Sequence, residues 1–272
     1  TYRGAGSMLG YGLSLTRPFR LQSDWGDNFG SSGQVATKTQ LKLWDWNPNV
    51  AIRLEPGLAL SLGAEYYQAQ KLIYSTAATR RDGDGDGWGG RVGLMFWRES
   101  GSIAVTHSTA AELDLSGDNL DGTQMTLPPR TRLGMKYRPS LRWSLHLDLV
   151  RTDWSQYKGL EGTSLPEKDW DPALGYRTAA LYRLSDGAEL RFGYAYDTDP
   201  KTRDSFDPRS LVGKRHTLTA GFGWETGAYK FNFGYGLTFW APREVNAAND
   251  AYDTRYKSNE RFMLFSVGHD FE

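Results

Sequence analysis

The chain has 272 residues, with 32 acidic and 32 basic side chains, four histidines and no cysteine. The formal net charge of zero argues against a nucleic-acid partner, and the lack of cysteine excludes a disulfide framework and a thiolate metal site. No apolar run approaches the roughly 20 residues that a transmembrane helix needs, and no segment has the composition of a linker. We therefore expect a single domain over residues 1–272.

Apolar and polar residues alternate in about twelve segments, each of a length suited to a β-strand. In chain order, the expected strands are approximately 6–18, 37–54, 58–73, 88–97, 102–115, 125–138, 142–156, 173–183, 188–197, 214–225, 229–240 and 257–271. The clearest strand, 229–240, has an apolar face made of Tyr229, Phe231, Phe233, Tyr235, Leu237 and Phe239. Because so many such strands follow one another without helices, we expect their apolar faces to contact lipid.

The predicted connections alternate in length. Tight turns are expected at 55–57, 98–101, 138–141, 184–187 and 226–228, and long polar loops at 19–36, 74–87, 116–124, 157–172, 198–213 and 241–256. Bacterial outer-membrane barrels place short turns in the periplasm and long loops outside, and carry aromatic girdles that suit the aromatic content of 14%. A soluble β-sandwich, the alternative, would not show this regular alternation.

These patterns predict an all-β fold: an antiparallel up-and-down transmembrane β-barrel of about 12 strands in the bacterial outer membrane. Its wall would contact outer-membrane lipid and lipopolysaccharide. Seven glycines are expected on the inner face, where they would leave room for water or a ligand: Gly63, Gly93, Gly193, Gly221, Gly223, Gly234 and Gly236.

Several segments resemble one known family. They are NPNVAIRLEPGLALSLGAEYYQA from Asn47, DGDGWGGRVGL from Asp84, RTRLGMKYRPSLRWSLHLDLVRTDWSQY from Arg130, LRFGYAYDTDP from Leu190 and KRHTLTAGFGW from Lys214. In this order they are similar to the FadL family of outer-membrane long-chain fatty-acid transporters, which includes channels for aromatic hydrocarbons. Members of that family have an N-terminal hatch and fourteen strands. The segment Leu9–Phe19 resembles their third strand, so we expect no counterpart of the hatch and of the first two strands in this chain.

The inner face is expected to carry mixed charge: Glu65, Arg91, Glu112, Asp114, Arg130, Arg132, Lys136, His146, Asp148, Arg177, Glu189, Arg191 and Arg215. Arg130, Arg132, Arg177 and Arg191 lie on neighbouring predicted strands and are the candidate ligand-binding residues, since guanidinium groups bind carboxylates. The alternative is that these charges form cross-strand ion pairs that fill the lumen.

Two other motifs are expected to carry no chemistry. Asp82, Asp84 and Asp86 alternate with glycines like half of a calcium loop, but Gly93 stands where its closing Glu would be, so we expect a solvated loop and no metal site. His107 and Ser108 invite comparison with barrel phospholipases, yet adjacent residues in a strand point to opposite faces. We therefore expect no catalytic residue, no cofactor and no enzymatic activity.

Three functions follow from this reading. The first is a channel for passive uptake of hydrophobic small molecules, such as long-chain fatty acids or aromatic hydrocarbons, as the family resemblance implies. The second is a non-transport barrel that serves as a scaffold or assembly unit for a protein partner in an outer-membrane complex. The third is a lipid-modifying barrel enzyme. The fold alone does not choose among them.

Overall fold

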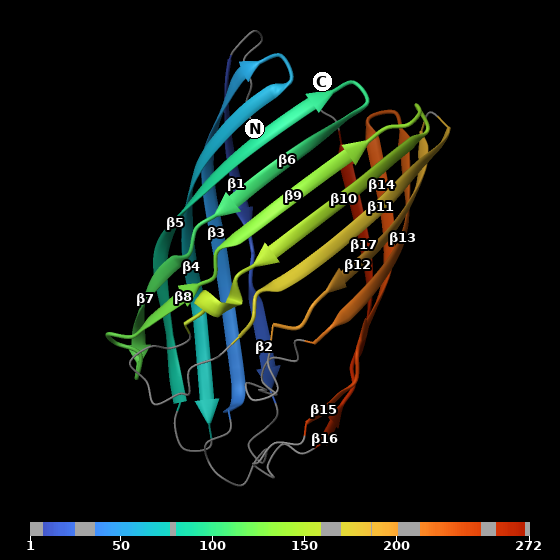
Figure 1. Ribbon diagram of the computed structural model, residues 1–272. Helices are drawn as coiled ribbons and strands as arrows, with labels where there is room; N and C mark the ends of the chain where they lie inside the picture. Colours follow the sequence, from blue (N-terminus) through green and yellow to red (C-terminus); the bar gives the residue numbers. More distant parts are fainter. Residues whose placement is uncertain are drawn as a thin grey trace.

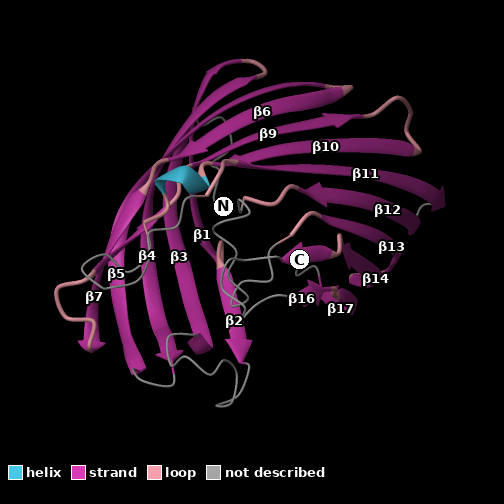
Figure 2. Ribbon diagram, turned by 60° about the horizontal axis from the view of Figure 1, so that its bottom comes forward, coloured by secondary structure: helices cyan, strands magenta, loops and turns pink. Residues whose placement is uncertain are grey.

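The protein is described by a computed structural model, which places residues 8–24, 36–76, 80–158, 170–185, 187–200, 213–245 and 254–269. These residues form one large, strongly curved antiparallel sheet (Figure 1). Seen from nearer one end, the strands describe an arc, with β3 to β5 on one side and β12 to β14 on the other (Figure 2). Among the described residues, no helix is long and apolar enough to cross a membrane.

Twelve strands follow one another along the main path of the sheet, each hydrogen-bonded to the next. They are β1 (Leu9–Thr16), β3 (Ala36–Glu55), β4 (Leu58–Thr76), β5 (Arg80–Arg98), β6 (Gly101–Ser108), β9 (Arg130–Tyr137), β10 (Trp143–Thr152), β11 (Ala173–Ser185), β12 (Ala188–Asp197), β13 (Arg215–Thr226), β14 (Tyr229–Trp240) and β17 (Asn259–His269). This order confirms the predicted all-β, antiparallel up-and-down architecture. Within the described residues, the two edge strands β1 and β17 do not pair with each other.

Shorter strands extend this path. β2 (Arg20–Asp24) pairs with β3 beyond the end of β1. β7 (Ala111–Asp118) pairs with β5 and with β8 (Gln124–Leu127), so this hairpin continues β6 and β9. β15 (Arg243–Val245) and β16 (Thr254–Tyr256) form a separate pair that follows β14 and precedes β17. The described helical structure is one 3-10 turn, η1 (Trp154–Gln156).

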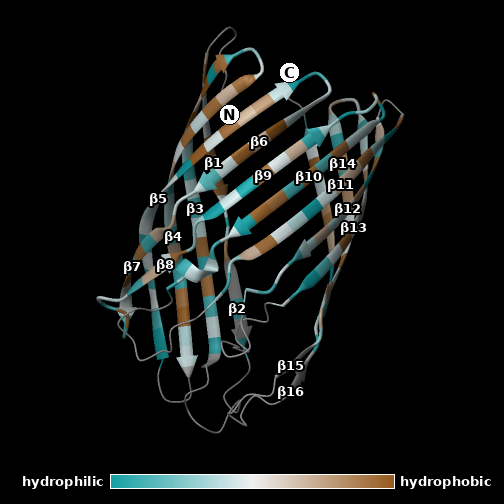
Figure 3. Cartoon of the chain, viewed as in Figure 1, coloured by the Kyte–Doolittle hydropathy of each residue, from teal (hydrophilic) through white to brown (hydrophobic). Residues whose placement is uncertain are grey.

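The outer face of the sheet is apolar and exposed, as the alternation predicted. Phe233 on β14 is 49% exposed, and its register partner Phe265 on β17 is 71% exposed. Figure 3 shows the apolar residues recurring along the strands. Exposed large apolar side chains in such numbers would be unstable in water, so this face is the lipid-contacting surface. The opposite, concave face is called the lumen here.

The tight connections and both described ends of the chain gather at one end of the sheet. Leu9 pairs with Ile52 near the Pro56-Gly57 turn, and His269 pairs with Tyr229 beside the Gly227-Ala228 turn. In barrels of this class the tight turns lie in the periplasm. The long connections lie at the other end, called the loop end here, and most of their residues fall outside the described ranges.

The predicted loop 74–87 is wrong, because β4 extends to Thr76 and β5 begins at Arg80. Its aspartates are strand residues with partners: Asp82 pairs with Arg80 at 2.6 Å, and the Ser116 hydroxyl donates to Asp84 at 3.0 Å. The intervening glycines have a packing role. A Cβ atom at Gly83, Gly85 or Gly87 would overlap with a carbonyl oxygen of β7, so only glycine lets β7 approach β5 this closely.

The predicted inward orientation of Glu112 and Asp114 is also wrong. Ser108 is buried on the lumen side, and regular alternation would place Glu112 there as well. Instead Thr109 and Ala110 interrupt the strand, Ala111 and the leucines of β7 are buried, and the two acids are exposed. A one-residue shift exchanges the two faces of a strand. Pro128-Pro129 causes the same exchange between β8 and β9, so the hairpin turns its apolar face into the lumen.

Candidate functional site

A buried apolar cluster fills the lumen toward the loop end. It consists of Leu43, Tyr67, Ala69, Leu72, Ala111, Leu113, Leu115, Leu120, Met125 and Leu127, from β3, β4, the β7–β8 hairpin and its turn. Leu113 and Leu120 are completely buried, which is unusual in a sheet whose outer apolar residues are exposed. Apolar burial on this scale makes the cluster the main packed core of the described chain.

An aromatic cluster adjoins this core. It is formed by four rings. Phe19 lies between β1 and β2, Trp154 lies in η1, Tyr157 directly follows η1, and Trp170 lies just before β11. Trp154 makes edge-to-face contacts with the other three rings at centroid distances of 5.3–5.6 Å, and Tyr157 stacks on Trp170 at 5.2 Å. Phe19 and Tyr157 also pack against the apolar core. Such rings offer a large, rigid apolar contact surface to a ligand.

A buried polar network lies on the turn-end side of this core. Asp45 on β3 and Glu65 on β4 are both fully buried, and Arg91 on β5 forms ion pairs with both. The Ser108 hydroxyl donates to Glu65 at 3.2 Å, and the Thr16 hydroxyl donates to Asp45 at 3.3 Å. One arginine therefore balances two buried carboxylates, and the network ties five strands of the wall together.

The predicted arginines do not form one group. Arg132 interacts electrostatically with Arg130, with Arg177 and with the carboxylate of Asp148. By strand register Arg130 lies four residues from the row of Arg177, toward the loop end, so Arg132 is the one that stands between them. Arg191 pairs in register with Leu181, four residues from Arg177 along β11 toward the tight turns, which corresponds to about 13 Å. It forms an ion pair with Glu189, to which its Nε atom donates at 2.6 Å.

The three neighbouring arginines differ in their partners. Arg177 is ion-paired with Asp197 at 2.9 Å, and Asp197 also accepts from Arg215 at 2.8 Å. Within the described residues, Arg130 and Arg132 have no carboxylate within ion-pair distance. The Arg130 guanidinium lies 5.9 Å from the centre of the Phe19 ring. Arg130 is thus a cation beside the aromatic cluster, without an ion-pair partner among the described acids.

The sequence reasoning missed the aromatic cluster. Trp154 and Tyr157 were expected as aromatic ends of a wall strand, and Trp170 fell in a predicted polar loop. The strand in fact ends at Thr152, and η1 turns these rings toward the core. A signal was available, because Trp154, Tyr157 and Trp170 stand in otherwise polar sequence next to the end of a strand.

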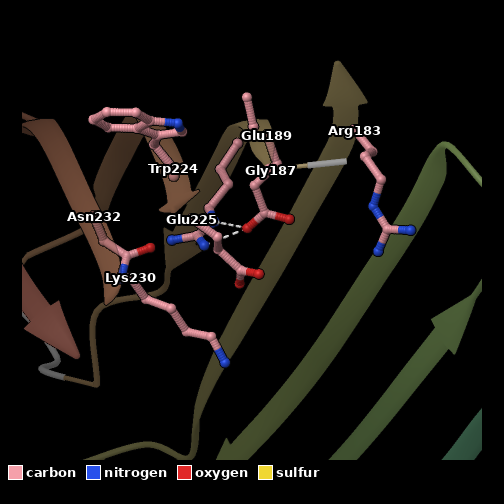
Figure 4. Close-up of a pocket in the computed structure, with 10 residues that line it drawn as sticks. Arg183, Gly187, Glu189, Trp224, Glu225, Lys230 and Asn232 are labelled. Atoms are coloured by element: carbon pink, nitrogen blue, oxygen red, sulfur yellow. Dashed lines mark hydrogen bonds and ion pairs between the residues drawn. The ribbon is translucent and has the colours of Figure 1, made fainter. Parts of the chain in front are cut away.

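At the tight-turn end, a pocket of about 400 Å³ is lined by charged side chains of β11 to β14 (Figure 4). Glu189 and Arg191 are paired, and Glu225 stands opposite Lys230 in the β13–β14 register. A Cβ atom at Gly223 would lie 2.9 Å from the Arg191 guanidinium. We expected the inward-facing Gly223 to leave free space in the lumen. The side chain of Arg191 occupies that space instead.

Comparisons with known proteins agree with this architecture. Residues 95–268 match the sequence model of the family described as outer membrane protein transport protein (OMPP1/FadL/TodX). No curated protein matches the sequence.

Solved structures of similar fold include a Pseudomonas aeruginosa FadL homologue, with a TM-score of 0.79 and 16% identity over 97% of this chain and 76% of that one. The Ralstonia pickettii toluene transporter TbuX matches with a TM-score of 0.67 and 14% identity, over 98% of this chain and 79% of that one. The Pseudomonas putida toluene transporter TodX matches with a TM-score of 0.61 and 13% identity, over 97% and 79%. At these identities the structural likeness concerns the fold.

Proposed function

Because the chain belongs to the OMPP1/FadL/TodX family of bacterial outer-membrane transport proteins, which carry hydrophobic compounds, we propose that it is a passive uptake channel whose ligands bind at the aromatic cluster. The substrates that fit this site are long-chain fatty acids and, less completely, aromatic hydrocarbons. The observation that supports the proposal is that an apolar aromatic surface lies beside a cation, Arg130. The hydrophobic body of a ligand would contact the rings of Phe19, Trp154, Tyr157 and Trp170.

Arg130 is the proposed partner of a carboxylate head group, with Arg132 next to it. A guanidinium group donates two parallel hydrogen bonds to a carboxylate and keeps its charge at all physiological pH values. Arg177 is already paired with Asp197, so its charge is not available in the same way. Arg191, engaged by Glu189 nearer the tight turns, has no part in this site. A neutral hydrocarbon would use the rings alone.

Ligand binding requires the rings to separate. The aromatic side chains contact one another, and the cleft beside Phe19 has a volume of about 40 Å³, space for a water molecule or two. Phe19 lies in the three-residue interruption between β1 and β2, where the backbone is not held in the strand ladder. We therefore expect Phe19 to move away from Trp154 when a ligand enters.

Intrinsic fluorescence tests the proposed site, because two of the ten tryptophans lie in the cluster. A brominated long-chain fatty acid should quench the folded protein saturably, and the double substitution Trp154→Phe and Trp170→Phe should remove the saturable part. Substituting the lipid-facing Trp88 by Phe is the matched control and should preserve it.

Uptake provides the functional readout. In a Gram-negative host without its own fatty-acid channel, the chain should restore uptake of radiolabelled oleate, and Phe19→Ala with Trp154→Ala should reduce it at equal outer-membrane abundance. If oleate and toluene both fail to enter through the wild-type protein, the proposed function is wrong. Equal uptake by the wild type and the double variant would move the binding site elsewhere.

A further inference from the structure

A second pocket, of about 620 Å³, lies at the tight-turn end of the lumen beside the pocket of Figure 4, with which it shares Arg183 and Glu189. Lys136 and Ser144 line it, whereas the adjacent Tyr137 and Leu145 point to the lipid face and are 56% and 40% exposed. The alternation of the strands therefore directs the pocket residues into the lumen.

The pocket carries an excess of positive charge. Four of its side chains are cationic, namely Lys136, Arg138, Arg142 and Arg183, and two are anionic, Glu99 and Glu189. Glu189 is already paired with Arg191. In the part of the chain that the structure describes, none of the four cations has a carboxylate within ion-pair distance.

The adjoining pocket provides an internal comparison. There Arg183, Arg191 and Lys230 face Glu189 and Glu225, and the Arg191–Glu189 pair neutralises its centre. Like charges held together in a wall disfavour the folded state unless a counter-ion joins them. The unbalanced pocket is therefore the one built to receive an anion.

The backbone holds these cations in place. The Ser140 hydroxyl accepts hydrogen bonds at 3.3 Å from the backbone N–H groups of Arg142 and Trp143, which orders the turn between β9 and β10. The N–H of Arg138 donates to the carbonyl of Ser100 at 2.7 Å, and the N–H of Arg183 donates to the carbonyl of Arg142 at 2.8 Å. Neighbouring turns thus bring the four charges to one rim without any ligand.

Apolar groups accompany the charges. Leu181 lines the pocket from β11, and Leu141 at its rim is 94% exposed. An inorganic anion would gain nothing from them, whereas an amphipathic anion would contact both kinds of group. We infer that this basic rim pocket binds the carboxylate of an amphipathic ligand at the periplasmic end of the lumen. The inference rests on the proposed function, since the ligand that it assigns to this pocket is of the class that the channel would carry.

The test uses the absence of cysteine from the chain. Ser100→Cys places a unique label in the pocket, and an environment-sensitive fluorophore on it reports binding to the folded full chain in detergent at pH 7. The probes are octanoate, 1-octanol and inorganic phosphate, each titrated below any micelle-forming concentration. Octanoate should give a saturable signal that weakens as salt rises, and octanol should bind about fivefold or more weakly.

Three variants separate the effect of charge from an effect on folding. Lys136→Gln with Arg142→Gln should weaken octanoate binding about fivefold or more, and Lys136→Arg should retain it. Lys230→Gln, in the adjoining pocket, should change it less than about twofold. Equal binding of octanoate and octanol, an unchanged affinity in the double glutamine variant, or phosphate binding as tight as octanoate would each overturn the inference. Oleate and toluene uptake by the wild type is scored separately, so failure of this site and failure of the channel function are distinguishable.

Discussion

Arg91 forms ion pairs with two fully buried carboxylates, Asp45 and Glu65. Removing one partner of a buried ionic group costs about 3–5 kcal/mol, because the remaining charge stays buried and uncompensated. Arg91→Met should therefore lower the free energy of unfolding by about that amount, measured by urea titration in lipid vesicles. The pair of Arg215 with Asp197 gives the control: Arg215 is exposed and Asp197 keeps its second partner Arg177, so Arg215→Met should cost less than about 1 kcal/mol. If both variants unfold alike, the two carboxylates are not held as ions by Arg91.

Asp153 precedes η1 outside the membrane-spanning strands, and its side chain accepts from the Ser155 hydroxyl at 2.6 Å. This hydrogen bond, followed by the smaller effect of Arg151, holds the pKa of Asp153 below its ordinary value, although burial opposes the shift. A lowered pKa in the folded state means that the stabilisation is present above the unfolded-state pKa of 3.8 and is lost as the pH falls through the lower folded value.

We therefore expect η1, which carries Trp154 of the aromatic cluster, to loosen in acid below that pKa. The tryptophan emission of the native protein should shift to the red in that range, while the β-sheet signal in circular dichroism persists. Ser155→Ala should move the shift to higher pH, and an unmoved midpoint would show that the hydroxyl does not tune Asp153.

Among the elements, the β7–β8 hairpin decides what occupies the loop end of the lumen. Its close approach to β5 depends on Gly83, Gly85 and Gly87, since any side chain there would overlap with β7 carbonyl oxygens. Gly87→Val should displace the hairpin and cost about 1–3 kcal/mol, as overpacking typically does. Limited proteolysis should then cut between β7 and β8, where the wild type is protected.

Gly10 on β1 supplies the control for this substitution. A Cβ atom at Gly10 would meet nothing within 4 Å, so Gly10→Ala should leave both stability and protection unchanged. If Gly87→Val is as resistant to protease as Gly10→Ala, the hairpin does not depend on the glycines of β5.

At the scale of the whole molecule, the lumen is apolar toward the loop end and charged toward the tight turns. A ligand that crosses the lumen would leave an aromatic surface and then meet a basic rim.

A narrow water-accessible pore stays a prediction. Within such a pore, the water content would be lowest at the apolar cluster. Leu113→Ser with Leu115→Ser should therefore raise single-channel conductance in planar bilayers, because both leucines are buried in that cluster. Asp114→Asn, on the exposed face of the same strand, should not. A silent channel in all three proteins would place the block elsewhere.

The sequence by itself determined the wall. A period of two directs alternate side chains to opposite faces by local geometry alone, so the order of the twelve main strands, the tight turns between them and much of the lipid-facing surface could be predicted. The family resemblance, drawn from these local patterns taken in order, was confirmed by the match of residues 95–268 to the sequence model of the family. The binding role of Arg130, Arg132 and Arg177 stays a prediction.

Only the tertiary structure decided the contents of the lumen. Thr109-Ala110 and Pro128-Pro129 each reverse the faces of a strand. The two prolines mark an interruption of the strand, but the direction in which the hairpin turns its apolar face depends on burying Leu113 against β3 and β4, which is a long-range gain. Phe19 and Trp154 are 135 positions apart and yet their rings are in contact. The alternation of residues within a single strand does not predict such a long-range contact. Arg191 was separated from the other arginines by strand register, which is fixed by pairing between strands and not by the spacing along any one of them.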